Sequence, residues 1–401
     1  MCSLRCLTVL VMGILCLLDE VCIGAEQATA AKADSFQWER ATPESQGLSS
    51  DRLDALRDSL AKRSTTALLI IRNDKIVYEW YDTHTDFRKP LGTASLAKAI
   101  VGGMALAVEI TDGKMSIDDL ASKYIPQWRD DPVKSKITIR QLGSHTSGIA
   151  DASERRIAHE DLTGWKGDFW KRLQPPNDPF TISRDLAPLN SSPGERMGYS
   201  NPGIGMMCYC ITAALRDAPQ HEIRTLLRDR IMRPINVPDE EWSAGYDETF
   251  HVDELPLVAA WGGGSYSANA QARIGRLVLR RGDWEGQRLL SVDAVRNVTT
   301  DAGLPGHCGM GWWTANERLA FPPDTVYGSG AHDRLLIVIP SLKMIAIRSG
   351  QDLMTSAEMA EMRERRQREA QADGQRGRGQ YRDPRDPIFY RPLMQAVVSD
   401  K

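Results

Sequence analysis

Two serine–lysine pairs stand out because each places a potential nucleophile three residues before a potential base. Residues 59–62 and 95–98 both read Ser-Leu-Ala-Lys. Residues three apart lie on one face of an α-helix, so their side chains can meet. A serine hydroxyl becomes a strong nucleophile when a neighbour takes its proton, and a desolvated, neutral lysine amine can do that. Serine and lysine are common enough that one or two chance matches are expected in a chain of 401 residues, so the tetrapeptide alone decides nothing.

The sequence around each pair indicates which of the two is catalytic. The first lies within 50–63, where leucines at every third or fourth position form one apolar stripe among charges, as in an amphipathic surface helix. A lysine there stays solvated and protonated. The second pair follows a loop broken by Pro and Gly and precedes 99–108, which is apolar nearly all round and predicts a buried helix. Burial lowers the pKa of an amine, so Ser95 with Lys98 is the expected catalytic pair.

A Ser-Lys pair also needs a group that passes the proton to the leaving group, and donors for the oxyanion. Tyr199-Ser200-Asn201 is a candidate for the first role, since it follows a Pro- and Gly-containing loop and directly precedes an apolar helix. Nearby ammonium groups favour the phenolate form of a tyrosine, and the amide of Asn201 can hold a substrate carbonyl. Taken alone, this tripeptide fits a structural loop equally well.

The order and contexts of these segments resemble the penicillin-recognising serine hydrolases, in particular the class C β-lactamase-related group. That group includes β-lactamases, D-Ala-D-Ala carboxypeptidases, D-aminopeptidases, esterases and aminohexanoate-oligomer hydrolases. The resemblance runs from about residue 41 to residue 349. It rests on four segments, namely Thr93–Lys98, Ser144-His145-Thr146-Ser147-Gly148-Ile149, Tyr199–Asn201 and Trp261-Gly262-Gly263-Gly264-Ser265-Tyr266-Ser267.

This resemblance implies an α+β fold, an antiparallel sheet flanked by helices, with an inserted helical subdomain and the cleft between them. It implies that Ser95 is the acylated nucleophile and that Lys98 is its base. Tyr199 resembles the proton shuttle that later activates the deacylating water, and Asn201 resembles the ligand of a substrate amide. The N–H of Ser95 would supply half of the oxyanion hole. His145 resembles a structural residue of its segment rather than a catalytic base.

The sequence departs from the family pattern at the third motif. Family members have Lys-Thr-Gly or a His-x-Gly variant on the strand that borders the cleft, and the cation helps to bind a substrate carboxylate. The corresponding segment of this chain is Gly328-Ser329-Gly330, followed by Ala331, so glycine replaces the cation. We expect the N–H of Ala331 to complete the oxyanion hole, a donor whose loss costs about 100- to 1000-fold. His332 and Arg334 are the candidate substitutes for the cation.

The missing cation shifts the expected substrate away from β-lactams and toward esters or amides. A β-lactamase or D-Ala-D-Ala carboxypeptidase acting on β-lactams or peptidoglycan peptides remains the alternative among enzymes. A non-catalytic binding protein on the same fold is the alternative of another class. Against that last reading, Ser95, Lys98 and Tyr199 are all present, whereas a degenerate scaffold is expected to have lost at least one.

Composition limits the partners. The chain has 401 residues and a formal net charge of -3, which gives no reason to expect nucleic acid or an anionic membrane surface as a partner. A zinc-binding helix is not predicted, because His159-Glu160 lacks a second histidine four places on. We expect a small-molecule or peptide-like acyl substrate, no cofactor and no metal. The oligomeric state is not indicated by the sequence.

The chain divides into an amino-terminal leader and one large domain. Residues 1–25 combine an early positive charge, an apolar run and a small-residue end, which predicts a secretory signal peptide and a periplasmic or secreted protein. The apolar run is too short for a comfortable membrane span. Residues 26–41 are a predicted linker and 42–401 the hydrolase domain. Within it we expect a helical subdomain at about 112–253 and a disordered, charged insertion at about 361–385.

Short, strand-like runs occur in two separate regions of the domain. The first region is a hairpin of 66–72 and 76–81, joined by Asn73-Asp74-Lys75. The second contains runs at 311–315, 334–340 and 344–348. A long helical block between two sets of antiparallel strands is typical of an α+β domain.

Overall fold

The computed structural model describes residues 36–154, 157–304, 306–372 and 383–398. The predicted signal peptide, 1–25, and all but the end of the predicted linker, 26–41, lie outside these residues. The chain divides into two units, 1–37 and 38–401, and every described helix and strand belongs to the second.

The main sheet of this unit has seven strands in the order β1-β3-β2-β14-β13-β12-β11. Neighbouring strands pair antiparallel, except that β1 runs parallel to β3. Both predicted strand regions are confirmed, and β2 and β3 form the predicted hairpin. The strands are β1 (Glu39–Arg40), β2 (Thr65–Arg72), β3 (Lys75–Tyr81), β11 (Trp313–Thr314), β12 (Val326–Gly330), β13 (Arg334–Ile339) and β14 (Met344–Gly350).

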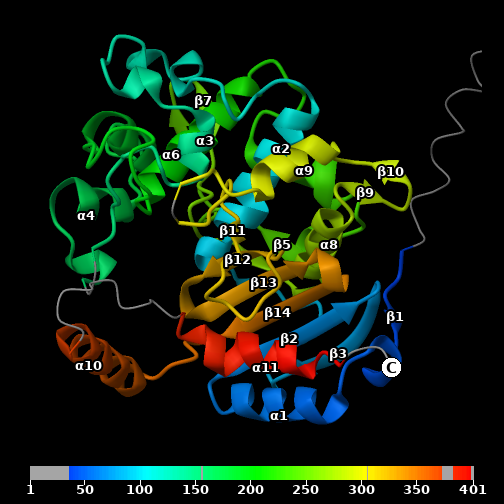
Figure 1. The fold of residues 1–401 in the computed structure, drawn as a ribbon. Helices are drawn as coiled ribbons and strands as arrows, with labels where there is room; N and C mark the ends of the chain where they lie inside the picture. The colour runs from blue at the N-terminus through cyan, green and yellow to red at the C-terminus, as the bar shows by residue number, and fades with distance from the viewer. Residues whose placement is uncertain (1–35, 155–156, 305, 373–382, 399–401) are drawn as a thin grey trace, which may run out of the picture. The chain divides into compact units, whose positions relative to one another are not determined.

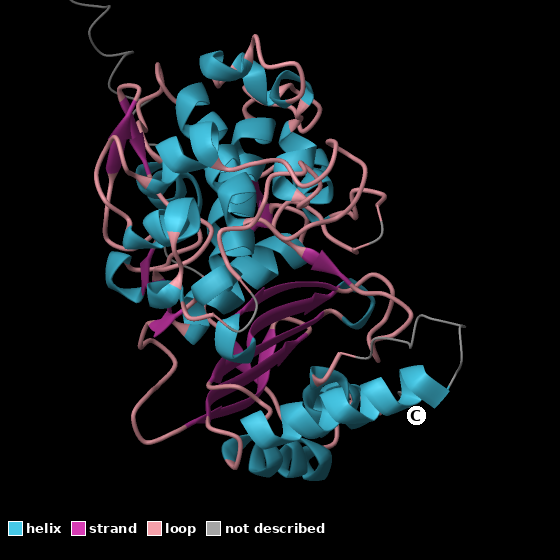
Figure 2. Ribbon diagram, turned by 90° about the vertical axis from the view of Figure 1, so that its left-hand side faces the viewer, coloured by secondary structure: helices cyan, strands magenta, loops and turns pink. Residues whose placement is uncertain are grey.

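Helices cover both faces of this sheet, which confirms the expected α+β architecture (Figures 1 and 2). On one face, α1 (Ser50–Ala61) and α11 (Arg391–Ala396) pack their apolar side chains against β2 and β13. On the other face, α8 (Ala268–Leu279) lies close against β13 and β14, because Gly275 has no side chain. A Cβ at Gly275 would come within 3.0 Å of Ile345. The central strands β2, β13 and β14 are therefore buried on both sides.

Most of the remaining chain consists of helices and loops and lies above the sheet in Figure 1. Residues 112–253 form short helices and loops with little strand. The helices are α2 (Met104–Thr111), α3 (Ile139–Gly143), α4 (Gly164–Lys171), α5 (Pro179–Thr181), α6 (Asn201–Ala214), α7 (Ile223–Leu227) and α9 (Val292–Thr299). The small strands are β4 (Leu91–Gly92), β5 (Trp242–Ser243), β6 (Phe250–Val252), β7 (Leu255–Leu257), β8 (Ser265–Tyr266), β9 (Asp283–Trp284) and β10 (Gln287–Arg288).

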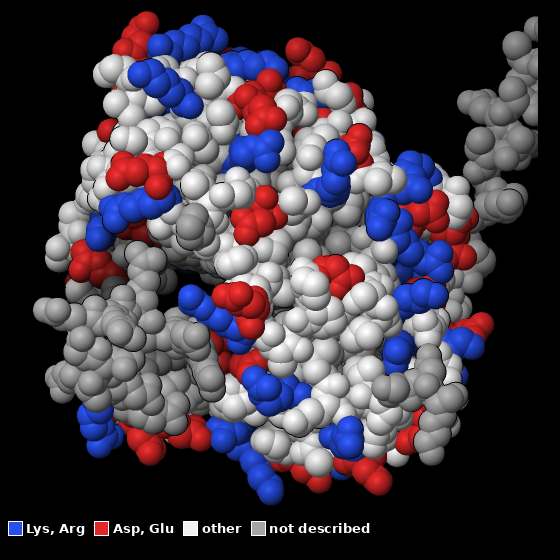
Figure 3. Space-filling view, in the orientation of Figure 1, with Lys and Arg blue, Asp and Glu red and all other residues white. Residues whose placement is uncertain are grey.

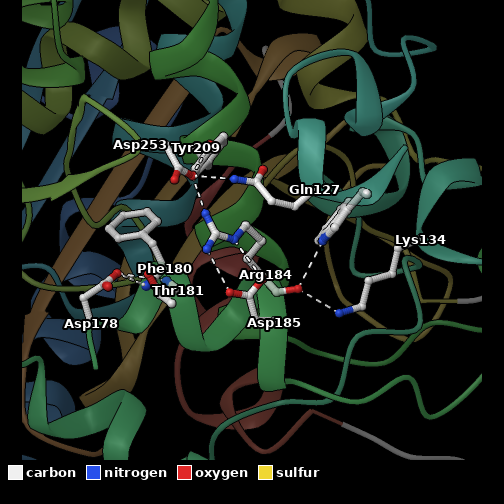
Figure 4. Close-up of polar contacts among 10 residues, drawn as sticks. Gln127, Lys134, Asp178, Phe180, Thr181, Arg184, Asp185, Tyr209 and Asp253 are labelled. Atoms are coloured by element: carbon white, nitrogen blue, oxygen red, sulfur yellow. Dashed lines mark hydrogen bonds and ion pairs between the residues drawn. The ribbon is translucent and has the colours of Figure 1, made fainter. Parts of the chain in front are cut away.

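A polar network centred on Arg184 ties parts of this helical region together (Figure 4). The guanidinium of Arg184 forms an ion pair with Asp253, in the turn between β6 and β7, and its carbonyl accepts a hydrogen bond from Lys134 at 2.8 Å. The carboxylate of Asp253 also accepts hydrogen bonds from Tyr209 at 2.6 Å and Gln127 at 3.1 Å. Segments far apart in the sequence are thus joined by charge-assisted hydrogen bonds, which are stronger than neutral ones.

The helical run Ala94–Thr111 has the length and mean hydropathy, 1.5, of a membrane span, but 78% of it is buried inside the protein. Its apolar surface is covered by other parts of the domain, as in a core helix. This confirms the prediction that the second Ser-Leu-Ala-Lys copy opens a buried helix. The first copy lies on α1, where Ser59 and Lys62 are exposed.

The prediction of a disordered charged insertion at 361–385 is wrong at both ends. Residues 361–372 continue helix α10 (Ser356–Ala372), and Arg385 donates a hydrogen bond to Ser329 on β12. Ala, Glu, Gln, Met and Arg dominate α10, and all are strong helix formers, so a scarcity of apolar residues does not prevent a helix in this segment. Residues 373–382, in the middle of the predicted insertion, lie outside the described residues.

We predict that Ser59→Ala changes the free energy of unfolding by less than about 0.5 kcal/mol, because the hydroxyl is solvated. Leu60→Ala, one residue on and fully buried against the sheet, should cost about 2–5 kcal/mol. Urea unfolding followed by circular dichroism measures both. A large loss of stability in Ser59→Ala would contradict the assignment of this copy to a surface helix.

Candidate active site

The turn that carries Ser95 is held in an uncommon backbone conformation. Ala94 has a φ of 48°, in the left-handed region that non-glycine residues adopt at a cost of about 1–3 kcal/mol. Two hydrogen bonds from Thr93 hold this turn, from its N–H to the carbonyl of Gly264 at 3.1 Å and from its hydroxyl to the carbonyl of Gly263 at 2.7 Å. The glycine-rich segment after Trp261 therefore fixes the direction in which Ser95 points.

Ser95 and Lys98 meet as predicted, but not on a regular α-helix. Ser95 lies in a single 3₁₀ turn, Ala94–Leu96, and Lys98 begins a π-helical stretch, Lys98–Gly103, that leads into α2. The Lys98 Nζ is 3.2 Å from the Ser95 Oγ. π-Helical turns are frequent at functional sites, but residues 182–186, 228–232 and 386–390 also form π-helical stretches, so the conformation alone does not mark this site.

The amine of Lys98 is buried and has two other partners. Its Nζ donates to the Asn201 Oδ1 at 2.8 Å and to the carbonyl oxygen of Trp261. Burial lowers the pKa of Lys98 from 10.5 to about 7, against a smaller opposing effect of the negative charge of Asp151. A neutral amine has two N–H groups and one lone pair. The two carbonyl oxygens occupy the N–H groups, which leaves the lone pair for the hydroxyl proton of Ser95.

Tyr199 approaches Ser95 from another direction. Its Oη lies 2.9 Å from the Ser95 Oγ, and the Lys98 Nζ lies 4.8 Å from the centre of its ring. The expectation that nearby ammonium groups favour the phenolate is wrong for the resting site. Burial raises the pKa of Tyr199 well above 10, and this effect is larger than that of any neighbour. The phenol therefore keeps its proton and donates it in a hydrogen bond to Ser95.

His145 supports Tyr199 and is not a base in this site. Its Nδ1 accepts a hydrogen bond from the N–H of Ser200 at 3.1 Å, and its carbonyl accepts one from the N–H of Gly198 at 2.8 Å. Its ring lies 4.6 Å from that of Tyr199. Burial, and to a smaller extent the charge of Lys98, lowers the pKa of His145 to about 3. The geometry thus fits a structural role for His145 and not a role as a catalytic base.

Asn201 contacts the catalytic lysine through its side-chain oxygen. Its Nδ2 and its backbone N–H both donate to one carboxylate oxygen of Asp151, each at 2.9 Å. These bonds orient the amide so that Oδ1 faces Lys98. Asn201 is predicted to hold a substrate amide, but in this structure its side-chain oxygen already accepts a hydrogen bond from Lys98 and its Nδ2 already donates to Asp151. The sequence did not reveal two groups of this site. Asp151 lies outside the recognised segments, and Trp261 belongs to one of them but contacts Lys98 through its backbone carbonyl rather than its side chain.

The third motif lies on β12, directly against the nucleophile turn. A Cβ at Gly328 would come within 2.3 Å of a methyl group of Leu96, and one at Gly330 within 2.2 Å of the carbonyl oxygen of Thr93. Only glycine allows this approach, which explains why no cationic side chain stands at 328. The end of β12 brings Ala331 to the cavity that contains Ser95, where its N–H can complete an oxyanion hole with that of Ser95.

A cavity of about 900 Å³ opens in front of Ser95. Neither predicted substitute for the cation lines it. His332 lies 3.3 Å from Asp352, and the guanidinium of Arg334 lies beside Gly92. The cavity wall includes instead Arg385, from the charged segment, together with Tyr199, His307, Trp313, Tyr327 and Ser329.

Outside the cavity, charges of both signs are interspersed on the face shown in Figure 3, which is hollowed at the left of the view. Among the described residues, no group of three or more His, Cys, Asp or Glu side chains lies close enough together to hold a metal ion.

The fold and the site together define a hydrolase of the β-lactamase fold. The model of the beta-lactamase family matches residues 53–372, and the chain belongs to this family.

Individual relatives are distant. A 6-aminohexanoate-dimer hydrolase from Paenarthrobacter ureafaciens is 24% identical over 319 residues, which cover 74% of this chain and 75% of the relative. A solved structure of a putative 6-aminohexanoate-dimer hydrolase from Bacillus anthracis superposes with a TM-score of 0.59 at 18% identity, covering 82% of this chain and 86% of that one. A family VIII carboxylesterase structure gives a TM-score of 0.59 at 15% identity, with coverage of 88% and 99%. These structural likenesses establish the fold.

We predict that kcat/KM for a neutral ester rises with pH through about 7 and then stays level, because only the neutral amine of Lys98 accepts the proton of Ser95. Asp151→Asn removes the negative charge that raises the pKa of Lys98 while keeping an oxygen for Asn201, so the rise should move to lower pH. Glu109→Gln is the control. Burial raises the pKa of Glu109 to about 7 as well, but Glu109 lies outside the cavity lining. A shift in the control variant alone would contradict the assignment to Lys98.

Proposed function

We propose that the protein is a serine hydrolase that forms an acyl-enzyme on Ser95 and hydrolyses an ester or an amide. The observation that carries this proposal is that the Ser95 Oγ lies between a buried amine at 3.2 Å and a phenol at 2.9 Å. One group can take the serine proton while the other can supply a proton to the leaving group. Nucleophile activation by an adjacent base is the requirement of covalent acyl transfer.

In acylation, the Ser95 proton passes to the Lys98 Nζ as Oγ bonds to the substrate carbonyl carbon. The N–H groups of Ser95 and Ala331 stabilise the oxyanion. The tetrahedral intermediate then collapses, the bond to the leaving group breaks, and Tyr199 gives that group its phenolic proton. Lys98 is left as an ammonium and Tyr199 as a phenolate. Their proximity, 4.8 Å from Nζ to the ring centre, stabilises this charge-separated state.

Deacylation restores the resting state with the same two groups. A water molecule gives a proton to the Tyr199 phenolate as its oxygen bonds to the acyl carbon. When the bond from that carbon to the Ser95 Oγ breaks, the serine oxygen takes the proton of the Lys98 ammonium. The net reaction consumes one water and releases an acid and an alcohol or amine.

The likeness to an aminohexanoate-dimer hydrolase and to a carboxylesterase supports an amide or ester substrate. The predicted signal peptide supports export of the enzyme to the periplasm or the medium. A β-lactamase or D-Ala-D-Ala carboxypeptidase remains the second candidate because the family includes both activities. It is disfavoured by Gly328, which stands where those enzymes have a cation.

We predict that the wild-type protein hydrolyses p-nitrophenyl acetate and that Ser95→Ala does not. Tyr199→Phe should lower kcat by about 100- to 10,000-fold, because it removes a general acid and base. Release of p-nitrophenol measures the rates, and intact mass spectrometry of rapidly quenched protein should find the acetyl adduct on Ser95. Ser59→Ala, with the same tetrapeptide, is the matched control and should retain full activity. An active Ser95→Ala protein would refute the mechanism.

We also predict that a fluorescent penicillin labels Ser95 much more slowly than the ester turns over, since no side chain at 328 supplies a cation for its carboxylate. Gel fluorescence after timed incubation measures the labelling. Labelling faster than ester turnover would favour the β-lactamase or carboxypeptidase candidate instead.

A further inference from the structure

Arg385 introduces a positive charge into the cavity from the carboxyl-terminal end of the chain. Its Nη1 donates to the Ser329 Oγ at 2.7 Å, at the middle position of the third motif. Its side chain is only 17% exposed, and both Arg385 and Ser329 line the cavity that contains Ser95. A charge therefore stands beside β12, although none is carried by the motif itself.

The guanidinium of Arg385 is held in a defined orientation. Its Nε donates to the Asp383 Oδ1 at 2.8 Å, and its Nη2 donates to the other carboxylate oxygen at 2.5 Å. Its Cζ lies 5.5 Å from the centre of the Tyr390 ring, which is fully buried. Arginine has five N–H donors, and these contacts with Asp383 and Ser329 account for three of them. The planar fork thus remains able to donate from Nη1 and Nη2 to a carboxylate in the cavity.

The anchoring of this segment gives the arginine a fixed position relative to the cavity rim. Asp386, one residue on, accepts a hydrogen bond from the N–H of Ala320 at 2.8 Å, and Ala320 follows the rim residues Asn316 to Leu319. Phe389, Tyr390 and Leu393 are buried in the core beneath the sheet. Arg385 is therefore attached to the same rigid layer that carries β12.

We propose that Arg385 is the specificity-determining cation of this enzyme and that it selects ester or amide substrates bearing a carboxylate. It enters from a different part of the chain and stands at Ser329 rather than at 328, so the carboxylate that it selects lies elsewhere than the carboxylate of a β-lactam held by a cation at 328. The inference rests on the hydrolase proposed above and narrows its substrate class. Asp383 orients Arg385, and its negative charge also opposes the positive charge of Arg385. Removing the charge of Arg385 should therefore weaken binding of an anionic substrate, and removing the charge of Asp383 should strengthen it.

The test compares kcat/KM for a charged and a neutral probe, mono-p-nitrophenyl glutarate and p-nitrophenyl butyrate, and for the pair 3-acetoxybenzoate and 3-acetoxybenzamide. The first pair places the carboxylate on the acyl side, and the second pair places it on the leaving-group side. Arg385→Gln should lower kcat/KM for the charged member of at least one pair by about 10- to 100-fold relative to its neutral partner, the range for hydrogen bonds to charged groups. Asp383→Asn should raise the same ratio.

Control variants keep the test specific. Arg391→Gln breaks a similar arginine–aspartate pair in the same segment, with Asp386 at 2.7 Å, but Arg391 does not line the cavity. Arg334→Gln and His332→Gln remove the two cations that follow β12 in the sequence.

Arg318→Gln removes the other arginine that lines the cavity. All four variants should leave the ratios unchanged. Equal losses on charged and neutral probes in Arg385→Gln would show a merely structural role and would overturn the proposal, as would a changed ratio in one of the other variants alone.

A binding measurement separates this inference from the proposed reaction. In the Ser95→Ala protein, which cannot form the acyl-enzyme, tryptophan fluorescence should report tighter binding of monomethyl glutarate than of dimethyl glutarate, by about 10-fold. Adding Arg385→Gln should abolish the difference. If the wild-type protein hydrolysed no ester while this difference persisted, the proposed reaction would fail and the anion site would stand. Equal binding of the two esters would overturn the anion site itself.

Discussion

The burial of the Lys98 amine is the constraint on which the rest of the site depends. An ammonium loses much of its hydration inside a protein, and in the described part of the chain no carboxylate forms an ion pair with it. The amine is instead held by two carbonyl oxygens and by the serine hydroxyl. Because those carbonyls satisfy the two N–H groups of the neutral form, neutrality costs no hydrogen bond. The same burial that makes the helix a core helix thus lowers the pKa of Lys98 to about 7.

Several segments that are far apart in the sequence contact the Lys98 amine or position the groups around it. The carbonyl of Trp261 reaches Lys98 from the glycine-rich segment that also holds Thr93 in place. Asn201, at the start of α6, is turned toward Lys98 by Asp151, and His145 fixes the two residues on either side of Tyr199 by hydrogen bonds to their N–H groups. Each contact is a hydrogen bond of 3.1 Å or shorter between segments far apart in the sequence.

Much of this could be predicted from the sequence, because local periodicity reflects burial. Apolar residues all round 99–108 distinguished Ser95 from Ser59, and short strand-like runs identified the β2–β3 hairpin and the strands β13 and β14. What could not be predicted depends on contacts between segments far apart in the sequence. The balance of burial and charge at Tyr199, the use of the Asn201 oxygen by Lys98, and the place of Arg385 in the cavity all require the folded chain. The glycine at 328 was evident in the sequence, but its cause, the approach of β12 to Leu96, was not.

The most direct test of the central claim is the pKa of Lys98 in the resting protein. Lysine labelled with ¹³C at Cε allows the titration to be followed by NMR, with Lys98→Met identifying the resonance. The account predicts a titration midpoint near 7. A midpoint near the ordinary lysine value of about 10.4 would mean that the amine is charged at neutral pH, and Lys98 could not then be the base that activates Ser95.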